Sequence, residues 1–228
     1  PLPVDPEVLS RIRPMTAADL PDVARLHAAA MGSSLWAQLG TRFLLAVYRA
    51  LVACTDFRGY VYLEDGLVRG FIAGSNNGPR MFREAAVRRA PLLAAAALPG
   101  LLQNPRVLWR LAQSAQYFGR SGVEGLEGVT AESMFCSFEP NLRGRRISGL
   151  INKVLFDELA ALGHHHVKIT TDADNPLAAR QLTSWGFERV GRFRFYSKEM
   201  IAWRLDLRSN PRVEAADRFG TAPMGGKP

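Results

Sequence analysis

One short stretch, EPNLRGRRISGL at residues 139–150, constrains this chain most. It follows a strand-like run at 132–138, ESMFCSF, and it leads into apolar residues at helical spacing: Ile147, Leu150, Ile151, Val154, Leu155, Leu159 and Leu162. Such a continuous apolar face packs against a sheet. The helix therefore begins at the carboxyl end of the preceding strand, and the chain must be an α/β protein.

The turn itself is basic, because Arg143, Arg145 and Arg146 stand where the helix begins. A helix start offers unpaired N–H groups and a partial positive charge, and arginine pairs well with phosphate. We therefore expect a phosphate-bearing ligand here, with a solvated basic turn as the alternative. The whole chain has a net charge of +8, which also favours anionic partners.

The remaining patterns predict a mixed α/β domain. A short strand at 11–15 is followed by helices at 16–32 and from about 34 to 51. Two strands, GYVYLED and LVRGFIAGS, meet at Asp65-Gly66, a strong hairpin signal. Two helix-like pieces rich in Arg, Ala and Leu then form a helical insertion at about 76–128. After 139–162 we expect a strand at 166–172, a helix at 175–185, and strands at 192–198 and 200–207.

These elements define the expected boundaries. Residues 1–10 are an N-terminal extension, 11–207 the domain with its insertion, and 208–228 a polar, Pro- and Gly-rich tail expected to be disordered. Two distant cysteines, Cys54 and Cys136, fit no metal spacing or disulfide framework, which favours a reducing, cytoplasmic location. We find no signal-peptide pattern and expect no membrane span.

Two motifs resemble those of the Gcn5-related N-acetyltransferases, the GNAT superfamily. Residues 143–148, RGRRIS, are similar to the family's pyrophosphate loop, Q/R-x-x-G-x-G/A, and NPLAARQLTSWGF from Asn175 resembles its next motif. The order and spacing of strands and helices agree over about 12–207. The resemblance implies a mostly antiparallel mixed sheet flanked by helices, with the helical insertion between the third and fourth strands.

The resemblance also implies how acetyl-CoA or another acyl-CoA is bound. The backbone N–H groups of 145–149 cradle the pyrophosphate, and the main chain near Ser137 and Phe138 pairs with the pantetheine arm and polarises the thioester carbonyl. Asn175 bonds that arm or braces the neighbouring strand. The implied cofactor-binding residues are Ser137, Phe138, Arg143, Gly144, Arg145, Arg146, Ile147, Ser148, Gly149 and Asn175.

The implied reaction is direct transfer of the acyl group to a primary amine in a ternary complex, and Glu132 is the expected general base. Its carboxylate lies in an otherwise apolar strand, which should raise its pKa; the alternative is a solvated or structural glutamate. The position of the family's usual tyrosine acid is Leu182, with Tyr196 and Ser184 as weak substitutes. We expect Cys136 to be a buried strand residue and His164–His166 a surface turn.

Three departures keep a second function class open. Arg146 and Ser148 replace small residues of the loop, and Leu182 replaces the acid, so the alternative is a non-catalytic acyl-CoA- or nucleic-acid-binding module on the same fold. Arginines of the insertion favour an acidic acceptor, either a phosphorylated or nucleotide-linked metabolite or an aminoacyl-tRNA. Its apolar pieces favour instead a greasy acceptor, a longer acyl chain, a membrane surface or a homodimer.

Overall fold

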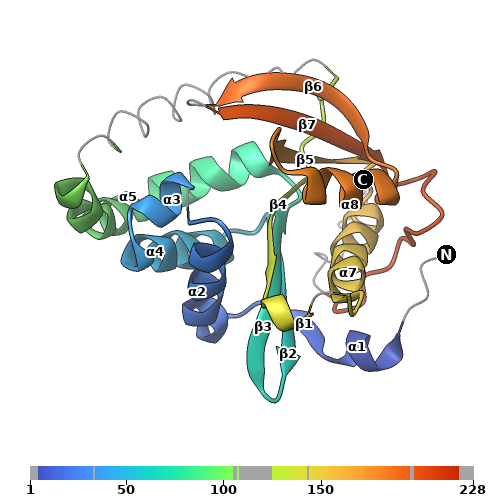
Figure 1. The fold of residues 1–228 in the computed structure, drawn as a ribbon, viewed down its shortest axis with the longest axis horizontal. Coiled ribbons are helices and arrows are strands. Elements are labelled where there is room, and N and C mark those ends of the chain that lie inside the picture. Colours follow the sequence, from blue (N-terminus) through green and yellow to red (C-terminus); the bar gives the residue numbers. More distant parts are fainter. Residues whose placement is uncertain are drawn as a thin grey trace.

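A computed structural model describes residues 5–32, 34–104, 107, 125–142, 144–195 and 198–220. They form one seven-stranded sheet in the order β1-β2-β3-β4-β5-β7-β6, in which only β4 and β5 are parallel (Figure 1). The strands are β1 (Ile12–Pro14), β2 (Phe57–Glu64), β3 (Leu67–Ser75), β4 (Glu132–Phe138), β5 (His166–Asp172), β6 (Glu188–Phe195) and β7 (Lys198–Asp206). The expected mixed, mostly antiparallel sheet is confirmed.

Helices cover both faces of this sheet (Figure 1). One layer holds α2 (Leu20–Ala30), α3 (Leu35–Gln38), α4 (Thr41–Val52) and α5 (Gly78–Gln103). The other holds α1 (Pro6–Ser10), α7 (Ile147–Ala161) and α8 (Pro176–Trp185), and short 3-10 turns occupy Ala17–Asp19 and Pro140–Leu142. The side chains of β2 alternate between the two faces of the sheet and so belong to two separate cores. Tyr60 and Tyr62 face α7, while Val61 faces α2 and α4.

The hairpin between β2 and β3 forms where its turn residues predict it. Asp65 and Gly66 both have positive φ, 54° and 74°. Only a turn with two left-handed residues matches the twist of the flanking strands, and Asp-Gly meets that need at low cost.

The sheet is divided at its centre, because β4 and β5 share one ladder pair, Glu132 with Lys168. Beyond that pair the two strands diverge (Figure 1). A bulge at Met134 adds a residue to β4 opposite Ala73 and Gly74 of β3, and such bulges bend the strand that carries them. The bulge also explains why two successive side chains, Met134 and Phe135, pack on the same core. The result is an open edge on β4.

The helical insertion lies between β3 and β4, as expected, and its described part is α5. This helix of 26 residues bends at Arg89, where φ is −123°, and contains Pro91 and Pro99. A proline removes a helical hydrogen bond and clashes with the preceding turn, which accounts for the bend two residues before Pro91. The expected second piece of the insertion, 105–118, falls almost wholly outside the described residues.

By length and composition, α5 could cross a membrane, although only 17% of its most apolar window is buried. The run without charged residues begins only at residue 90, after Arg88 and Arg89. The expectation that no segment spans a membrane therefore stays a prediction.

The prediction of a disordered tail from Arg208 is wrong for residues 208–220, the C-terminal strap. The strap returns along α7, where Asp157 accepts hydrogen bonds from the backbone of Glu214, at 2.8 Å, and from the guanidinium of Arg218, at 2.8 Å. The ammonium of Lys153 donates to the carbonyl of Arg212 at 2.7 Å. Asp157 is fully buried, so these partners are what offset its desolvation. Residues 221–228 lie outside the described residues.

Candidate functional site

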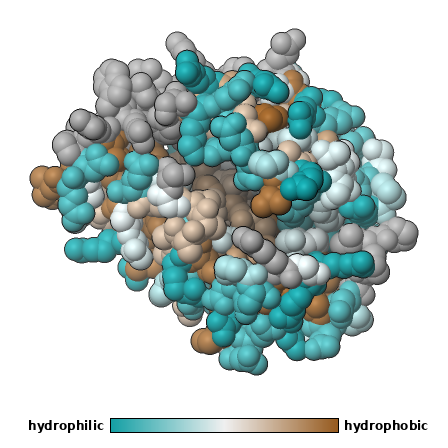
Figure 2. Space-filling model, in the orientation of Figure 1, coloured by the Kyte–Doolittle hydropathy of each residue, from teal (hydrophilic) through white to brown (hydrophobic). Residues whose placement is uncertain are grey.

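The open edge of β4 presents unpaired backbone groups to a cleft. The N–H of Glu139 donates to the carbonyl of Arg69 on β3 at 2.9 Å. Groups alternate in direction along a strand, so the N–H and C=O of Phe138 and Cys136 point away from β3. They point toward the space where β5 has diverged, and the same face of the molecule is hollowed near its middle (Figure 2). An extended ligand arm could pair with this edge as an added strand.

Ser137 does not share that orientation. By the same alternation its main chain faces β3, opposite Phe71, and its buried hydroxyl donates to the carbonyl of Leu26 at 3.2 Å. The main chain of Ser137 therefore cannot pair with a strand added at the open edge, whereas that of Phe138, whose ring packs over Gly70, is free to do so. A side chain at residue 70 would collide with that ring, since its Cβ would lie 2.1 Å from Cδ1 of Phe138.

The start of α7 has the groups that could hold an anion, and we call it the cradle. Within the described part of the chain, no side chain caps this helix, and its first free N–H groups belong to Ile147, Ser148 and Gly149. The N–H of Arg145 is already used, donating to the carbonyl of Leu142 at 3.3 Å. Ile147 is 1% exposed and anchors the helix start in the core. A phosphate placed here meets three N–H groups and the positive end of a 15-residue helix.

The backbone leading into the cradle is left-handed at two positions. Gly144 has φ 81° and Arg146 has φ 58° and ψ 9°. The left-handed backbone explains why the loop that residues 143–148 resemble has glycine at the position of Arg146. This conformation costs a residue with a side chain about 1–2 kcal/mol. Arg146 keeps the required conformation, and its side chain is exposed.

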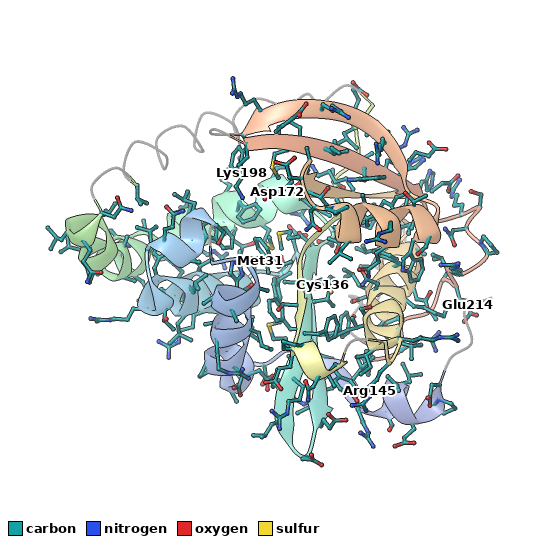
Figure 3. The ribbon with its side chains drawn as sticks, in the orientation of Figure 1. Met31, Cys136, Arg145, Asp172, Lys198 and Glu214 are labelled. Atoms are coloured by element: carbon teal, nitrogen blue, oxygen red, sulfur yellow. The ribbon has the colours of Figure 1, made fainter. Side chains whose placement is uncertain are left out.

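The arginine side chains are not all free for a ligand. Arg145, which is labelled in Figure 3, pairs with Glu64 of β2 at 2.7 Å, and Glu64 also meets Arg11 at 3.5 Å. The hydrogen bond from Arg145 lowers the pKa of Glu64, so this carboxylate stays charged. Arg143 lies outside the described residues. Glu64 was missed from the sequence because nothing local links the end of a hairpin strand to a turn 81 residues later.

Glu132 lies at the closed end of the cleft, where β4 still pairs with β5. Its side chain is 19% exposed, and Oε2 lies 3.8 Å from the ammonium of Lys168. Burial raises the pKa of Glu132, and the charge of Lys168 offsets part of that rise. Gly78 at the start of α5 leaves the carboxylate room, because a Cβ there would lie 2.8 Å from Oε2. A partly buried carboxyl with a raised pKa suits a general base.

Cys136 was expected to be buried, and the structure shows it exposed on β4 (Figure 3). The expectation failed because β5 leaves the sheet here and no strand covers the thiol. The sulfur lies at the floor of the cleft, where surrounding protein atoms exclude much of the water. This desolvation raises the pKa of Cys136 to about 12. The amide of Asn152 lies 3.8 Å from Sγ. A thiol with this pKa is a poor nucleophile.

The expected residues of the second motif have structural roles. Asn175 caps α8, its side chain accepting from the N–H of Ala178 at 3.1 Å. Leu182 is 7% exposed and packs in the core, so this position offers no acid. Ser184 donates to the carbonyl of Gln181 at 2.7 Å, and Tyr196 lies outside the described residues.

Aromatic side chains line the opposite side of β4. The ring of Phe135 lies 5.0 Å from Trp36 and 4.9 Å from His27, and Phe82 of α5 lies 6.1 Å from Trp36. Trp36, Phe82 and Phe135 are all partly exposed. His27 is fully buried between Tyr48, at 2.8 Å, and Ser34, at 3.2 Å, and burial lowers its pKa to about 4. It is therefore a neutral structural residue.

Two of the insertion's four described arginines are paired with carboxylates. Arg80 pairs with Asp56, and Arg88 pairs with Glu84 at 3.0 Å. Within the described part of the chain, the argument for an acidic acceptor is left to Arg83 and Arg89, which are exposed, while Arg106 and Arg110 fall outside it.

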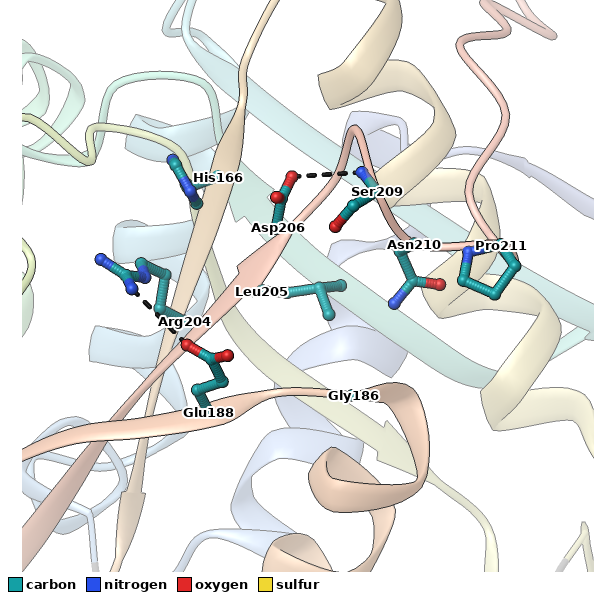
Figure 4. Close-up of a pocket in the computed structure, with 9 residues that line it drawn as sticks. All are labelled: His166, Gly186, Glu188, Arg204, Leu205, Asp206, Ser209, Asn210 and Pro211. Carbon is teal, nitrogen blue, oxygen red and sulfur yellow. Dashed lines mark hydrogen bonds and ion pairs between the residues drawn. The ribbon is translucent and has the colours of Figure 1, made fainter.

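A second hollow of about 370 Å³ lies away from the open edge, between β5, β7 and the turn after α8 (Figure 4). Arg204 pairs with Glu188 at 3.5 Å, and Asp206 accepts from the N–H of Ser209 at 3.3 Å. Its charged groups thus satisfy one another. In the described residues no cluster of His, Cys, Asp and Glu could hold a metal ion, and His166 simply forms part of β5.

No protein-family model matches the chain, and no curated protein matches its sequence. Solved structures do share its fold. SsHAT aligns with a TM-score of 0.58 at 14% identity, over 84% of this chain and 96% of that one. The ribosomal-protein-S18-alanine N-acetyltransferase from Escherichia coli aligns with a TM-score of 0.53 at 12% identity, over 91% and 97%.

Another similar structure is yncA from Salmonella typhimurium with its cofactor acetyl-CoA. It aligns with a TM-score of 0.52 at 17% identity, over 86% of this chain and 92% of that one. At such identities the likeness is one of fold, and it extends over nearly the whole length of each relative.

Proposed function

We propose that this chain, which has the fold of the GNAT acetyltransferases, is an acyl-CoA-dependent N-acyltransferase. The observation that carries the proposal is the pairing of two open features at the cleft. The uncapped start of α7 suits a pyrophosphate, and the unpaired edge of β4 suits an extended pantetheine arm. Similar structures hold such ligands: yncA has acetyl-CoA, and the NatC complex is bound to a Gag peptide and CoA.

In the proposed reaction the amine nitrogen attacks the thioester carbonyl, a new C–N bond forms, and the C–S bond breaks. Glu132 accepts the proton that the amine loses, directly or through one water molecule. The outward N–H of Phe138 on β4 donates to the carbonyl oxygen as negative charge develops there. The departing thiolate takes its proton from water, because Leu182 supplies none and a thiol of ordinary pKa, ~8.5, needs little help to leave.

The acceptor proposed is a primary amine next to an apolar or aromatic group. Phe135 and Phe82 lie on the side of β4 and α5 where Gly78 leaves room for Glu132. With Trp36 they offer an apolar wall, and a protonated amine is attracted to aromatic faces before it is deprotonated. The pairing of Arg80 and Arg88 with carboxylates weakens the argument for a phosphorylated or tRNA-linked acceptor.

The test is release of free CoA from acetyl-CoA with a panel of amines, comparing aromatic and aliphatic amines and peptides with nucleotide-linked amines. We expect turnover with the apolar members and its loss in Glu132→Gln. Calorimetric titration with CoA is run beside it. CoA binding without turnover of any amine would favour a non-catalytic acyl-CoA-binding module, the alternative that Leu182 supports, and no CoA binding would refute both.

A further inference from the structure

The second half of α5 exposes an apolar surface that the proposed reaction does not use. From 90 to 103 the helix carries no charged residue. Its inner side is docked on the domain, since Gly100 is buried so closely against Leu39 that a Cβ there would lie 2.5 Å from the Leu39 carbonyl. Its outer side is apolar and open: Leu92 is 40% exposed, Leu98 55% and Leu102 76%.

We call this outer face, formed by Val87, Leu92, Leu98 and Leu102, the α5 face. It accounts for four of the six exposed large hydrophobic side chains of the described chain. A helix that is apolar all round is normally covered on every side, and contiguous exposed apolar patches mark interaction sites. The segment that carries it lies at one end of the molecule (Figure 1), so a large flat partner could reach it.

Basic residues flank Val87, the first residue of this face, on the same helix. Arg83 stands one turn before Val87, and Arg88 and Arg89 follow it; all three are exposed. Glu84 pairs with Arg88, and within the described part of the chain Arg83 and Arg89 make no ion pair. The segment is thus cationic at its start and apolar through its end.

We propose that the α5 face docks the protein on the surface of an anionic lipid bilayer. The leucines enter the boundary between headgroups and acyl chains, and the arginines meet lipid phosphates. The helix lies on the bilayer and does not span it. Residues 90–103 extend only ~21 Å at 1.5 Å per residue, against a hydrocarbon core of ~30 Å, and their inner side is occupied by the domain. A second copy fits less well, because each copy would bring the same uncompensated arginines to the contact.

The experiment is co-sedimentation of the full chain with large unilamellar vesicles, made of phosphatidylcholine alone or of equal parts phosphatidylcholine and phosphatidylglycerol. We expect binding to the anionic vesicles, weakened by salt. Leu98→Glu with Leu102→Glu should lower the partition coefficient at least tenfold. The matched control is Leu177→Glu, which places the same charge on a leucine of α8 that is 65% exposed and should leave binding unchanged.

Circular dichroism and CoA titration establish that the double variant is folded. The double variant Arg83→Gln with Arg89→Gln should bind anionic vesicles more weakly, with no change in binding to vesicles of phosphatidylcholine alone. No binding to anionic vesicles at low salt would overturn the proposal, as would binding that survives the double glutamate change. A wild-type dimer in solution that the double variant dissociates, without vesicle binding, would assign the α5 face to a second copy and also overturn it. None of these outcomes depends on acyl transfer.

Discussion

Replacing Arg146 with glycine should make the protein more stable and a weaker binder of CoA. Arg146 holds a left-handed backbone, φ 58°, at the start of α7. Relief of that conformation is worth about 1–2 kcal/mol, and the added freedom of glycine in the unfolded chain takes back about 0.5–1 kcal/mol. The expected net gain is about 0.5–1 kcal/mol, a rise in Tm of roughly 1–4 °C for a chain of this size.

The loss of affinity comes from the side chain. A charge-assisted hydrogen bond to phosphate contributes about 1.5–3 kcal/mol. Arg146 is exposed, so solvent screening favours the lower end, and the dissociation constant for CoA should rise about tenfold.

Two variants separate backbone from side chain. Arg146→Ala removes the guanidinium but keeps a Cβ in the left-handed region, so it should lose the same affinity and gain no stability. Asp65→Gly changes the left-handed residue of the β2–β3 turn, φ 54°, which aspartate already adopts at low cost, and should gain no stability and leave the affinity unchanged. Scanning calorimetry gives Tm, and isothermal titration gives the dissociation constant. The reasoning fails if Arg146→Gly lowers Tm, or if it leaves CoA affinity unchanged.

Four further outcomes are expected. Glu132→Gln should lower kcat by ~10²–10⁴-fold. Lys168→Met should shift the acid limb of the profile of kcat against pH to higher pH, because the ammonium of Lys168 lowers the pKa of Glu132 that burial raises. If the acid limb does not move, Glu132 is not the base. Glu64→Gln should tighten CoA binding in titration, since it releases Arg145, and weaker binding would show that Glu64 orients that arginine. The rate of alkylation of Cys136, followed by mass spectrometry, should rise about tenfold per pH unit from pH 7 to 9.5 with no plateau, because the pKa of the thiol is about 12. A rate that levels off near pH 8.5 would show that the thiol is not desolvated in the cleft.

Removal of the Glu132 charge has a second consequence, on stability. Burial raises the pKa of this carboxyl in the folded protein, so folding favours its protonated form. Its contribution to stability is present below the ordinary glutamate pKa and is lost as the pH rises through the folded value. Glu132→Gln should therefore raise Tm at neutral pH, with the gain disappearing in acid. A residue whose loss stabilises the protein while abolishing activity is a functional one.

The elements predicted best from the sequence were those whose signals are local. The β2–β3 hairpin follows from Asp65-Gly66 and two alternating strands, and α7 ends one residue before the predicted Leu162. These structures depend on backbone preference and on apolar period, which neighbouring residues determine. The C-terminal strap could not be predicted in the same way, because its partners, among them Asp157, Lys153 and Trp185, are far away in the sequence.

In the candidate site, too, the features that depend on neighbouring residues were predictable, and those that depend on distant contacts were not. The cradle at the start of α7 was predictable, since glycine, arginine and an apolar helix follow one another there. The exposure of Cys136 was not, because it depends on β5 leaving the sheet and on the bulge at Met134. The pairing of Arg145 with Glu64 was not predictable either. In this pair a carboxylate of the protein itself offsets part of the repulsion among the arginines of the turn without any ligand.

The C-terminal strap also sets the order in which the molecule can be completed during synthesis. Asp157 and Lys153 of α7 are buried in the finished protein, and two of their partners, Glu214 and Arg218, are made only after every strand of the sheet. Until those residues emerge, Lys153 and Asp157 have each other, at 3.1 Å, but lack the hydrogen bonds that the strap supplies. Earlier segments can collapse as they appear, but α7 must wait for the strap. A ribosome that stalls before residue 214 would leave a chain with every strand of the sheet and an unfinished central helix.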